Sequence, residues 1–296
     1  MQENKLRIYQ NATAIVTGGA SGIGKAIAEE LVRRGAEVVL ADLQQPEVQG
    51  VAAKIVAGGG RATAVILDVA DRTAMIKLVT ETFVRTGRLD FMFNNAGVNV
   101  AGGVHQLSPD DWDYINNINI RGVVNGVQAA YPLMLRQGFG HIVNMGSIAG
   151  LIAAPGIVAY SMTKHAVVGL SRSLRAEAGL SGIRVSVLCP GIIRTPMSES
   201  GGRYGRSYAQ VNPDMRKHIA KKVRAMPSDL FARRALDAVA RNKAIIVEPA
   251  SWRWRWRFNR LCPDFAITIA QKILKKKLVV LGIWSGGQEK PLWQRP

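Results

Sequence analysis

The chain has 296 residues, of which 48% are hydrophobic and 20% are charged, and its formal net charge is +18. This composition is ample for one large hydrophobic core, while its two cysteines exclude a disulfide framework and indicate a reducing compartment. The polar N-terminus lacks the apolar core of a signal peptide, and no apolar run approaches the roughly 20 residues of a membrane span. We therefore predict a cytoplasmic protein.

Short apolar runs alternate with helical patterns along the first 250 residues. Strands are predicted at 12–17, 36–42, 62–69, 89–95, 141–147, 183–191 and 244–249. Helices are predicted from the glycine turn to Arg34, from the second strand to the glycines at 58–60, and then at 71–86, 109–137 and 160–180. Because the strands are apolar throughout and separated by helices, they indicate a parallel sheet covered on both faces. We predict a single doubly wound α/β domain over residues 1–250, with about seven strands.

A glycine-rich turn, Thr17 to Gly24, joins the first predicted strand to the first helix. Glycines permit a tight turn and close backbone approach to a pyrophosphate, and the N-terminus of the helix offers free N–H groups. The spacing is G-x-x-x-G-x-G and differs from the commonest G-x-G-x-x-G, so the prediction depends on the position between strand and helix. A plain tight turn is the alternative.

Asp42 ends the second predicted strand, 18 residues after Gly24. A carboxylate at this place accepts hydrogen bonds from the adenosine ribose hydroxyls and repels a 2′-phosphate. Its neighbours Ser21 and Leu43 are not basic, and Lys25 is expected to point along the helix. These features favour NAD over NADP, with an ordinary aspartate in a turn as the alternative.

Tyr160 and Lys164 lie four positions apart in a predicted helix, so that they share one face. An ammonium group beside a phenol lowers the phenol pKa and makes it a usable acid/base near neutral pH. Ser147 ends the preceding strand, at the edge where doubly wound sheets bind ligands, and could hold a substrate oxygen. Taken singly, the first two fit a surface pair and the third fits a helix cap.

Together these residues resemble the ordered motifs of the short-chain dehydrogenase/reductase family. The motifs are the glycine run, Asp68-Val69, Asn94-Asn95-Ala96-Gly97, Asn119, Ser147, Tyr160-x-x-x-Lys164 and Pro190-Gly191, and they span roughly residues 10–250. The resemblance implies a Rossmann-type fold and an NAD-preferring oxidoreductase. We therefore expect hydride transfer between NAD(H) and a secondary alcohol or ketone, with a lipophilic substrate.

The resemblance also implies roles for individual residues. Tyr160 would be the general acid/base, Lys164 would bind the nicotinamide ribose and tune Tyr160, Ser147 would polarise the carbonyl, and Asn119 would hold a relay water. The implied cofactor contacts are Gly18, Ser21, Gly22, Ile23, Gly24, Asp42, Leu43, Asp68, Val69, Asn95, Ala96, Gly97, Tyr160, Lys164, Pro190, Gly191, Ile193 and Thr195. No metal is implied, since the four histidines are scattered without ligand spacing.

Residues 198–226 correspond to the substrate-covering lid of the family and are rich in Lys and Arg. Two interpretations stay open for this segment. It is either a solvated helical flap, or a basic surface that recognises an acidic or phosphorylated substrate or a thioester of coenzyme A or a carrier protein.

Residues 251–296 form a basic, Trp-rich extension beyond the family pattern. Residues 199–296 contain 21 Lys and Arg against 7 Asp and Glu, so an anionic partner is expected to contact this part of the chain. Aromatic residues alternate with arginines over 252–258, and an extended backbone would separate them onto two faces. Beyond Pro263 an apolar helical stripe runs beside lysines: its residues are Ile269, Ala270, Ile273 and Leu274.

Two hypotheses for the extension carry equal weight. It is peripheral to an anionic membrane at its inner face, or it is an arm packed over the substrate site or a neighbouring subunit, with arginines stacked on tryptophans. Nucleic acid is disfavoured, because the charge fits but no nucleic-acid module is present.

For the whole chain, the rival to the enzyme is a non-catalytic NAD(H)-binding protein tethered to a membrane or polyanion by its tail. The complete set of Asn119, Ser147, Tyr160 and Lys164 favours the enzyme, because a retired enzyme needs none of them. The resemblance further implies a homodimer or homotetramer that assembles through the long helices at 110–137 and 157–180.

Overall fold

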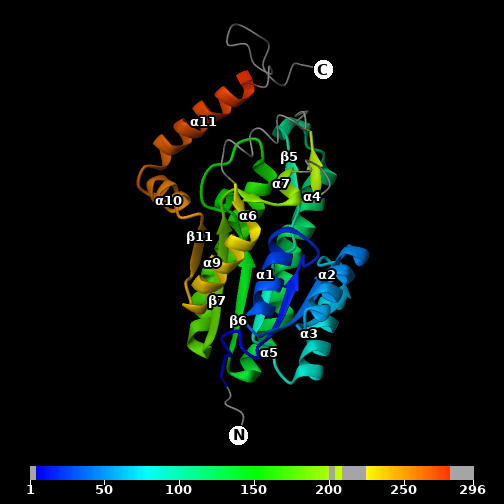
Figure 1. Ribbon diagram of the computed structural model, residues 1–296. Helices are drawn as coiled ribbons and strands as arrows, with labels where there is room; N and C mark the ends of the chain where they lie inside the picture. The colour runs from blue at the N-terminus through cyan, green and yellow to red at the C-terminus, as the bar shows by residue number, and fades with distance from the viewer. Residues whose placement is uncertain (1–4, 200–203, 209–224, 281–296) are drawn as a thin grey trace.

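The computed structural model describes residues 5–199, 204–208 and 225–280 of the chain. Its centre is a seven-stranded sheet in the order β11-β7-β6-β4-β1-β2-β3, in which every neighbouring pair is parallel (Figure 1). The seven predicted strands are all present, within a few residues of their predicted bounds. They are β1 (Thr13–Thr17), β2 (Glu37–Asp42), β3 (Arg61–Ile66), β4 (Phe91–Asn94), β6 (Gly140–Met145), β7 (Ile183–Pro190) and β11 (Ile245–Glu248).

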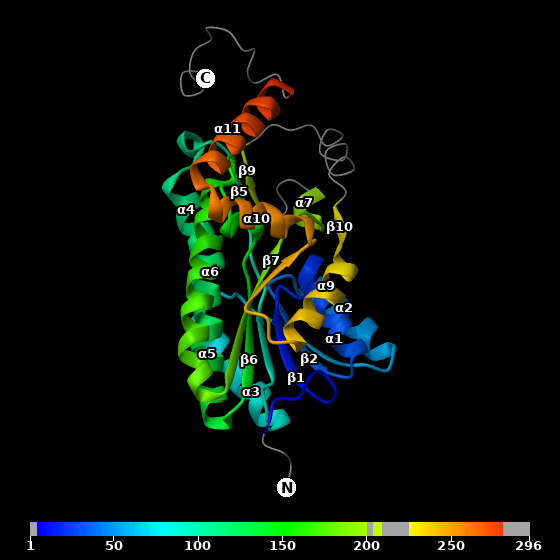
Figure 2. The ribbon, with the colours of Figure 1, turned by 90° about the vertical axis from the view of Figure 1, so that its left-hand side faces the viewer.

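Helices cover both faces of the sheet, as the apolar strands predicted (Figure 2). One face packs against α1 (Gly22–Arg33), α2 (Gln45–Ala57) and α9 (Ser228–Ala240). The other packs against α3 (Arg72–Thr86), α5 (Gly122–Gln137) and α6 (Val158–Ala178). The fold is therefore the predicted Rossmann-type α/β architecture.

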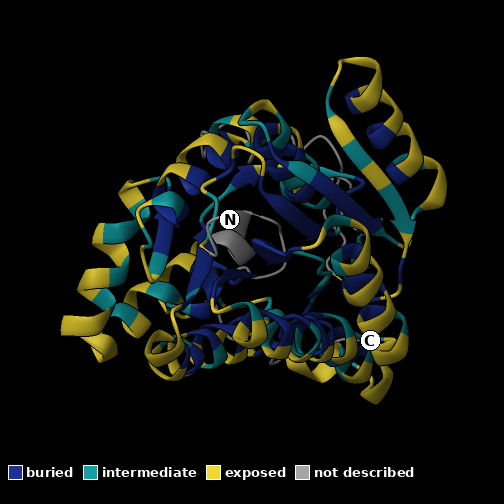
Figure 3. Cartoon of the chain, turned by 90° about the horizontal axis from the view of Figure 1, so that it is seen from below, coloured by how far each residue is buried: buried dark blue, intermediate teal, exposed yellow. Residues whose placement is uncertain are grey.

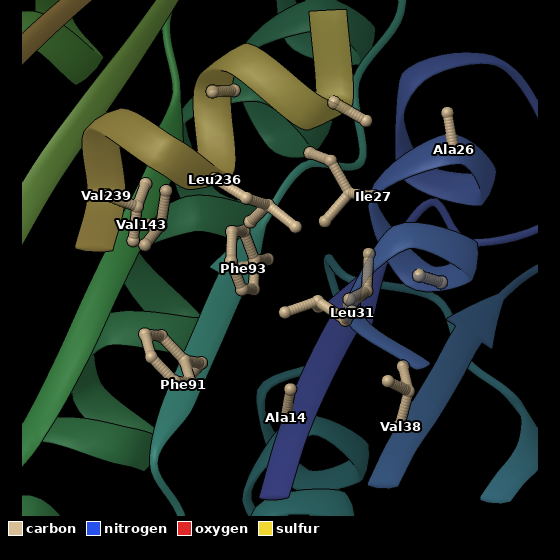
Figure 4. Close-up of a cluster of buried hydrophobic side chains, with 14 of the residues drawn as sticks. Ala14, Ala26, Ile27, Leu31, Val38, Phe91, Phe93, Val143, Leu236 and Val239 are labelled. Atoms are coloured by element: carbon tan, nitrogen blue, oxygen red, sulfur yellow. The ribbon is translucent and has the colours of Figure 1, made fainter. Parts of the chain in front are cut away.

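Successive residues of each central strand enter opposite hydrophobic layers. Phe91 and Phe93 of β4 lie on the α1 and α9 side, beside Ile27 and Leu236 (Figure 4), whereas Met92 enters the layer beneath α3 and α5. This alternation is the geometry of a pleated strand buried on both faces. Seen from below, the strands are buried and the outward sides of the helices are exposed (Figure 3).

The predicted helix at 109–137 consists of three parts. A helix, α4 (Pro109–Asn116), runs into a π-helical turn at Asn117–Arg121 and then into α5. The turn coincides with the buried side chain of Asn119, whose amide bonds the backbone of Val98 in the neighbouring loop. A π turn inserts an extra residue into the helical repeat and is often found at functional sites.

The tryptophan and arginine run forms a helix, and the expectation of an extended backbone there is wrong. This helix is α10 (Ser251–Leu261), and it is followed by the predicted helix beyond Pro263, α11 (Pro263–Val280). In a helix each guanidinium reaches the ring three or four positions earlier. The Arg255, Arg257 and Arg260 Cζ atoms lie 4.5, 5.2 and 5.7 Å from the ring centroids of Trp252, Trp254 and Trp256.

Most of the predicted lid lies outside the described residues. The described part includes β9 (Gly205–Ser207), which pairs in parallel with β5 (Asn99–Ala101). None of the helices in the described part of the chain is both long and apolar enough to cross a membrane.

An ion pair at the amino end of β4 is sealed into the core. Asp90 is fully buried and accepts hydrogen bonds from Arg88 Nε at 2.7 Å and from the backbone nitrogen of Thr13 at 2.9 Å. The pair therefore ties the entry of β4 to that of β1.

We predict that Arg88→Met lowers the free energy of unfolding by about 3–5 kcal/mol, because it strands the Asp90 carboxylate without its cation. Arg233→Met, which breaks an exposed pair with Asp229, should cost about 1 kcal/mol or less. Urea denaturation measures both. Equal effects of the two substitutions would contradict a structural role for the buried pair.

Candidate active site

A cavity of about 390 Å³ opens at the carboxyl ends of the strands. It lies where the strand order reverses between β1 and β4, the place at which doubly wound folds bind ligands. Sixteen of the predicted site residues line it: Gly18, Ser21, Gly22, Ile23, Gly24, Asp42, Leu43, Asp68, Val69, Asn95, Ala96, Gly97, Tyr160, Lys164, Pro190 and Thr195.

The other four predicted residues do not line the cavity. Asn119 and Ser147 are buried directly behind it, and Ile193 belongs to the hydrophobic core. Gly191 is packed beneath Trp252, a residue of α10. Asn119 and Ser147 nevertheless adjoin residues of the cavity, Asn119 beside Gly97 and Ser147 beside Tyr160.

The glycine turn needs its glycines for two separate reasons. Gly18 and Gly22 have φ angles of +68° and +56°, a region that residues with a Cβ rarely adopt. Gly24 needs space, because a Cβ there would overlap the Gly18 carbonyl oxygen and the Asn95 amide. The start of α1 can therefore lie directly against the loop that follows β4.

Asn95 and Thr17 join the loops that follow β4 and β1. The Asn95 side-chain nitrogen donates to the carbonyl oxygens of Thr17 at 2.9 Å and Gly18 at 3.2 Å. In return, the Thr17 hydroxyl oxygen accepts from the backbone nitrogens of Asn95 at 3.0 Å and Ala96 at 3.1 Å. The two loops thus form one continuous wall of the cavity.

Asp42, the last residue of β2, is held in place by backbone N–H groups of two neighbouring turns. Its carboxylate accepts a hydrogen bond from the backbone nitrogen of Ala20 and another from that of Gln44, each at 3.0 Å. Asp42 also lines the cavity. It therefore has the backbone hydrogen bonds of an ordinary turn aspartate and also a position at which it could meet a ligand. Lys25 runs along α1 to Glu29 at 2.9 Å, as expected.

Tyr160 and Lys164 project from the first turns of α6 into the cavity. The Lys164 nitrogen lies 5.4 Å from the centroid of the Tyr160 ring and donates to the Met145 carbonyl oxygen at 2.9 Å. Gly97 closes this corner: a Cβ there would stand 3.1 Å from Asn119 Oδ1 and 3.4 Å from Lys164 Nζ. Asn119 therefore abuts the same pocket as the ammonium group.

Burial is the largest influence on the pKa values of Tyr160 and Lys164. It lowers the pKa of Lys164 to about 8 and raises the pKa of Tyr160, against a lowering hydrogen bond from Ser147. Desolvation of the phenolate is the larger effect, so the Tyr160 pKa lies above its ordinary value, and tuning of that pKa by Lys164 stays a prediction. Ser147 also caps the short turn Ile148–Gly150 by accepting from Ala149 N at 3.1 Å.

The described part of the lid is anchored by a buried carboxylate. Asp111 of α4 is fully buried and accepts hydrogen bonds from Arg206 and from the Tyr208 hydroxyl, each at 2.7 Å. Burial acts to raise the Asp111 pKa, but these bonds and those from Ser108 hold it well below its usual range. At least one lid arginine therefore has a structural role.

Several cavity residues carry no recognisable motif. Eight of them lie within two positions of a predicted residue and could have been found by extending each motif: Gln44, Leu67, Val98, Ile118, Met145, Gly146, Pro196 and Met197. The other two, Tyr114 and Tyr204, are brought to the cavity by tertiary packing. Within the described ranges, no group of three or more His, Cys, Asp or Glu side chains gathers in a metal-binding arrangement.

Helix α10 braces the loops that follow β6 and β7. Trp252 covers Gly191 so closely that a Cβ on the glycine would overlap the indole, and Trp252 and Trp256 both pack on the core beneath α6. The Asn259 side-chain nitrogen donates to the Leu151 carbonyl oxygen at 3.4 Å, a few residues beyond Ser147. The inner side of α10 thus packs on the body of its own chain, whereas an arm over the substrate site or a neighbouring subunit stays a prediction.

Comparison with known proteins identifies the family. The family model described as short chain dehydrogenase matches residues 12–203. Oxidoreductase UcpA of Escherichia coli is 41% identical over 217 residues, which are 73% of this chain and 80% of that protein. The chain therefore belongs to the short-chain dehydrogenase/reductase family of oxidoreductases, whose members use NAD(P).

Two further comparisons agree in family and fold. Meso-2,3-butanediol dehydrogenase of Serratia marcescens is 40% identical over 190 residues, 64% of this chain and 74% of that protein. The crystal structure of a family member from Burkholderia phymatum in complex with NAD superposes with a TM-score of 0.79 at 27% identity. That match covers 88% of this chain and 96% of the other.

We predict that Gly191→Ala displaces α10 from the loop after β7 and lowers both thermal stability and turnover. Because the obstacle is the Trp252 ring, the cost of Gly191→Ala should be smaller in a Trp252→Ala background. A double-mutant cycle followed by thermal denaturation measures this coupling. Strictly additive effects would show that the two residues do not meet.

Proposed function

We propose that the protein transfers a hydride between NAD(H) and a lipophilic secondary alcohol or ketone. The observation that carries the proposal is that one cavity is lined by Tyr160 and Lys164 at one end and by the glycine turn and Asp42 at the other. Such an arrangement fits the two ends of an extended dinucleotide, with the reactive ring beside the tyrosine.

The bound nicotinamide would supply or accept the hydride, and the chain would manage the proton and the alignment. We propose that the Tyr160 hydroxyl gives its proton to the forming alkoxide during reduction, and takes it back during oxidation. Ser147, which lies beside Tyr160, would hold the same substrate oxygen. Lys164 would bind the nicotinamide ribose and stabilise the phenolate by its charge.

Asn119 fits a positioning role in this scheme better than direct contact with a ligand. Its amide is occupied by the Val98 backbone at 2.8 and 2.9 Å and by the Thr163 hydroxyl at 3.1 Å. We propose that Asn119 holds the loop at Gly97 against Lys164. A relay water would then lie beside Asn119 without replacing its hydrogen bonds to Val98 and Thr163. The relay remains a proposal from the family resemblance.

The preference for NAD is proposed from the charge at the adenosine end. Asp42 is fixed in the cavity wall by two backbone N–H groups, so it cannot swing away from a ribose without losing them. Its negative charge would accept ribose hydroxyls and repel a 2′-phosphate. The adjoining lining residues, Leu43 and Gln44, bring no positive charge.

A lipophilic substrate is proposed from the large apolar and aromatic side chains that line the cavity outside the family motifs. They include Val98, Tyr114, Ile118, Met197 and Tyr204. Recognition of an acidic group by the lid gains no support from Arg206, because its guanidinium is paired with Asp111 and lies 4.6 Å from the Tyr114 ring centroid. The remaining basic lid residues lie outside the described ranges.

We further propose residues 1–250 as the catalytic domain, with 198–226 as its lid, in a homodimer or homotetramer. A contact through α6 would have to accommodate α11. Met162 and His165 of α6 share an apolar cavity with Ala270 and Leu274 of α11, so the extension borders the helix on which the family resemblance places the subunit contact.

We predict that Tyr160→Phe retains NADH binding but lowers kcat by about 100-fold or more, since general acid–base catalysis contributes about 10²–10⁴-fold. Turnover is measured on a panel of hydrophobic secondary alcohols and ketones. Tyr114→Phe, a change in the same cavity, is the matched control and should keep its activity. Undiminished turnover by Tyr160→Phe would overturn the mechanism.

We predict that fluorescence titration gives tighter binding of NADH than of NADPH, and that Asp42→Asn narrows the difference. Loss of hydrogen bonds to a charged group, worth about 1.5–3 kcal/mol, should weaken NADH binding about tenfold or more. Glu81→Gln, which removes the same charge at an exposed site on α3, should leave both affinities unchanged. Tighter binding of NADPH by the unaltered protein would refute the assignment of Asp42.

A further inference from the structure

The two helices beyond β11 present a basic surface that the proposed chemistry does not use. Residues 251–280 contain eight Lys and Arg residues and a single acidic residue, Asp264. Both helices lie toward the end of the molecule where α4 and α7 (Pro196–Glu199) stand, and α11 projects beyond it (Figures 1 and 2). This is also the end at which the carboxyl ends of the strands surround the cavity.

The inner side of helix α10 packs on the protein, whereas its outer side is exposed. Trp252, Trp256 and Asn259 recur at helical spacing and face the body of the protein. Trp254 and Leu261 lie on the opposite side and are 71% and 81% exposed. Large apolar side chains this exposed are costly in water unless another surface covers them.

The outer side of α10 continues onto α11. Phe258 meets Phe265 edge to face, with ring centroids 5.9 Å apart, across the bend between the helices. Phe265, Ile269 and Ile273 then follow at intervals of four and are all exposed. We call Trp254, Phe258, Leu261, Phe265, Ile269 and Ile273 together the outer stripe.

Cations flank the outer stripe along its length. Arg257 lies over the Trp254 ring, which keeps the charge beside the apolar surface. On α11, Lys272 and Lys276 follow Ile269 and Ile273 by three positions, so they stand on the same side of the helix. An apolar strip edged by Lys and Arg, with tryptophan at one end, matches the boundary between lipid headgroups and acyl chains.

We propose that the outer stripe docks the protein on an anionic lipid bilayer. The apolar side chains would enter the interface while the cations meet acidic headgroups. A nucleic acid would engage the charges but leave the apolar stripe unused. A symmetric contact with a second copy would bring the two basic surfaces against each other. The bilayer therefore accounts for both features at once, and it would bring the cavity end of the molecule toward the lipid.

Vesicle flotation of the full-length protein tests the proposal. We expect binding to phosphatidylcholine vesicles that contain phosphatidylglycerol, much weaker binding to phosphatidylcholine alone, and loss of binding as salt shortens the Debye length from about 10 Å at 0.1 M to 3 Å at 1 M. Equal binding to both vesicles, or binding to neither, would overturn it. So would binding of duplex DNA or RNA at a salt concentration that abolishes vesicle binding.

Pairs of variants distinguish binding through the outer stripe and its flanking cations from binding due to the overall charge or hydrophobicity of the surface. Lys272→Gln with Lys276→Gln should weaken binding about 25-fold, at about fivefold for each cation, whereas Lys54→Gln with Arg72→Gln on exposed sites of other helices should not. Trp254→Ser with Leu261→Ser should abolish binding, whereas Val84→Ser with Leu180→Ser, which are 76% and 93% exposed, should not. Unchanged NADH affinity shows that each variant is folded.

Direct contact is read from tryptophan fluorescence. Brominated acyl chains should quench emission from Trp254, and the quenching should fall in Trp254→Phe, which keeps an aromatic stripe and should still float. Equal quenching in that variant would show that Trp254 does not enter the bilayer. If the protein with Trp254→Ser and Leu261→Ser floated normally but changed its oligomeric state, the stripe would be assigned to another partner. These readouts do not depend on turnover, so they stand even if the proposed reaction is wrong.

Discussion

The close contact between the turn after β1 and the loop after β4 is the constraint on which the rest of the site depends. Asn95 donates to the backbone of Thr17 and Gly18, and only a glycine at 24 leaves room for α1 to begin against them. That contact sets the cavity at the reversal of strand order and aligns its two ends. Asp42 at one end and Tyr160 at the other are then positioned by strands and helices of a rigid core.

Elements outside the sheet complete the site by bracing its loops. Helix α10 covers Gly191 and contacts Leu151, so it supports the segments that follow Ser147 and Pro190. On the opposite side, Asp111 fastens the described part of the lid through Arg206. The basic residues of the C-terminal third thus divide between internal contacts, such as that of Arg206 with Asp111, and positions that flank the outer stripe, such as Arg257 and Lys272.

Much of the fold could be predicted from sequence, because strands buried on both faces leave uninterrupted apolar runs. Cavity residues next to a strand end or within a glycine turn, such as Gly18 and Asp42, were predictable for the same local reason. The alternation of Trp and Arg over 252–258 was misleading. In such a sequence an Arg follows a Trp by three positions and another Trp follows it by four, and both are neighbour spacings on a helix. Tyr114 and Tyr204 left no local signal, because tertiary packing alone brings them to the cavity.

The proposed reaction depends most on the orientation of the dinucleotide, and a crystal structure of the complex with NAD tests that orientation directly. We expect the adenosine ribose hydroxyls at Asp42, the pyrophosphate against Gly22 and Gly24, and the nicotinamide ribose within hydrogen-bonding distance of Tyr160 and Lys164. Electron density for NAD in the reverse orientation, or outside this cavity, would contradict the central claim.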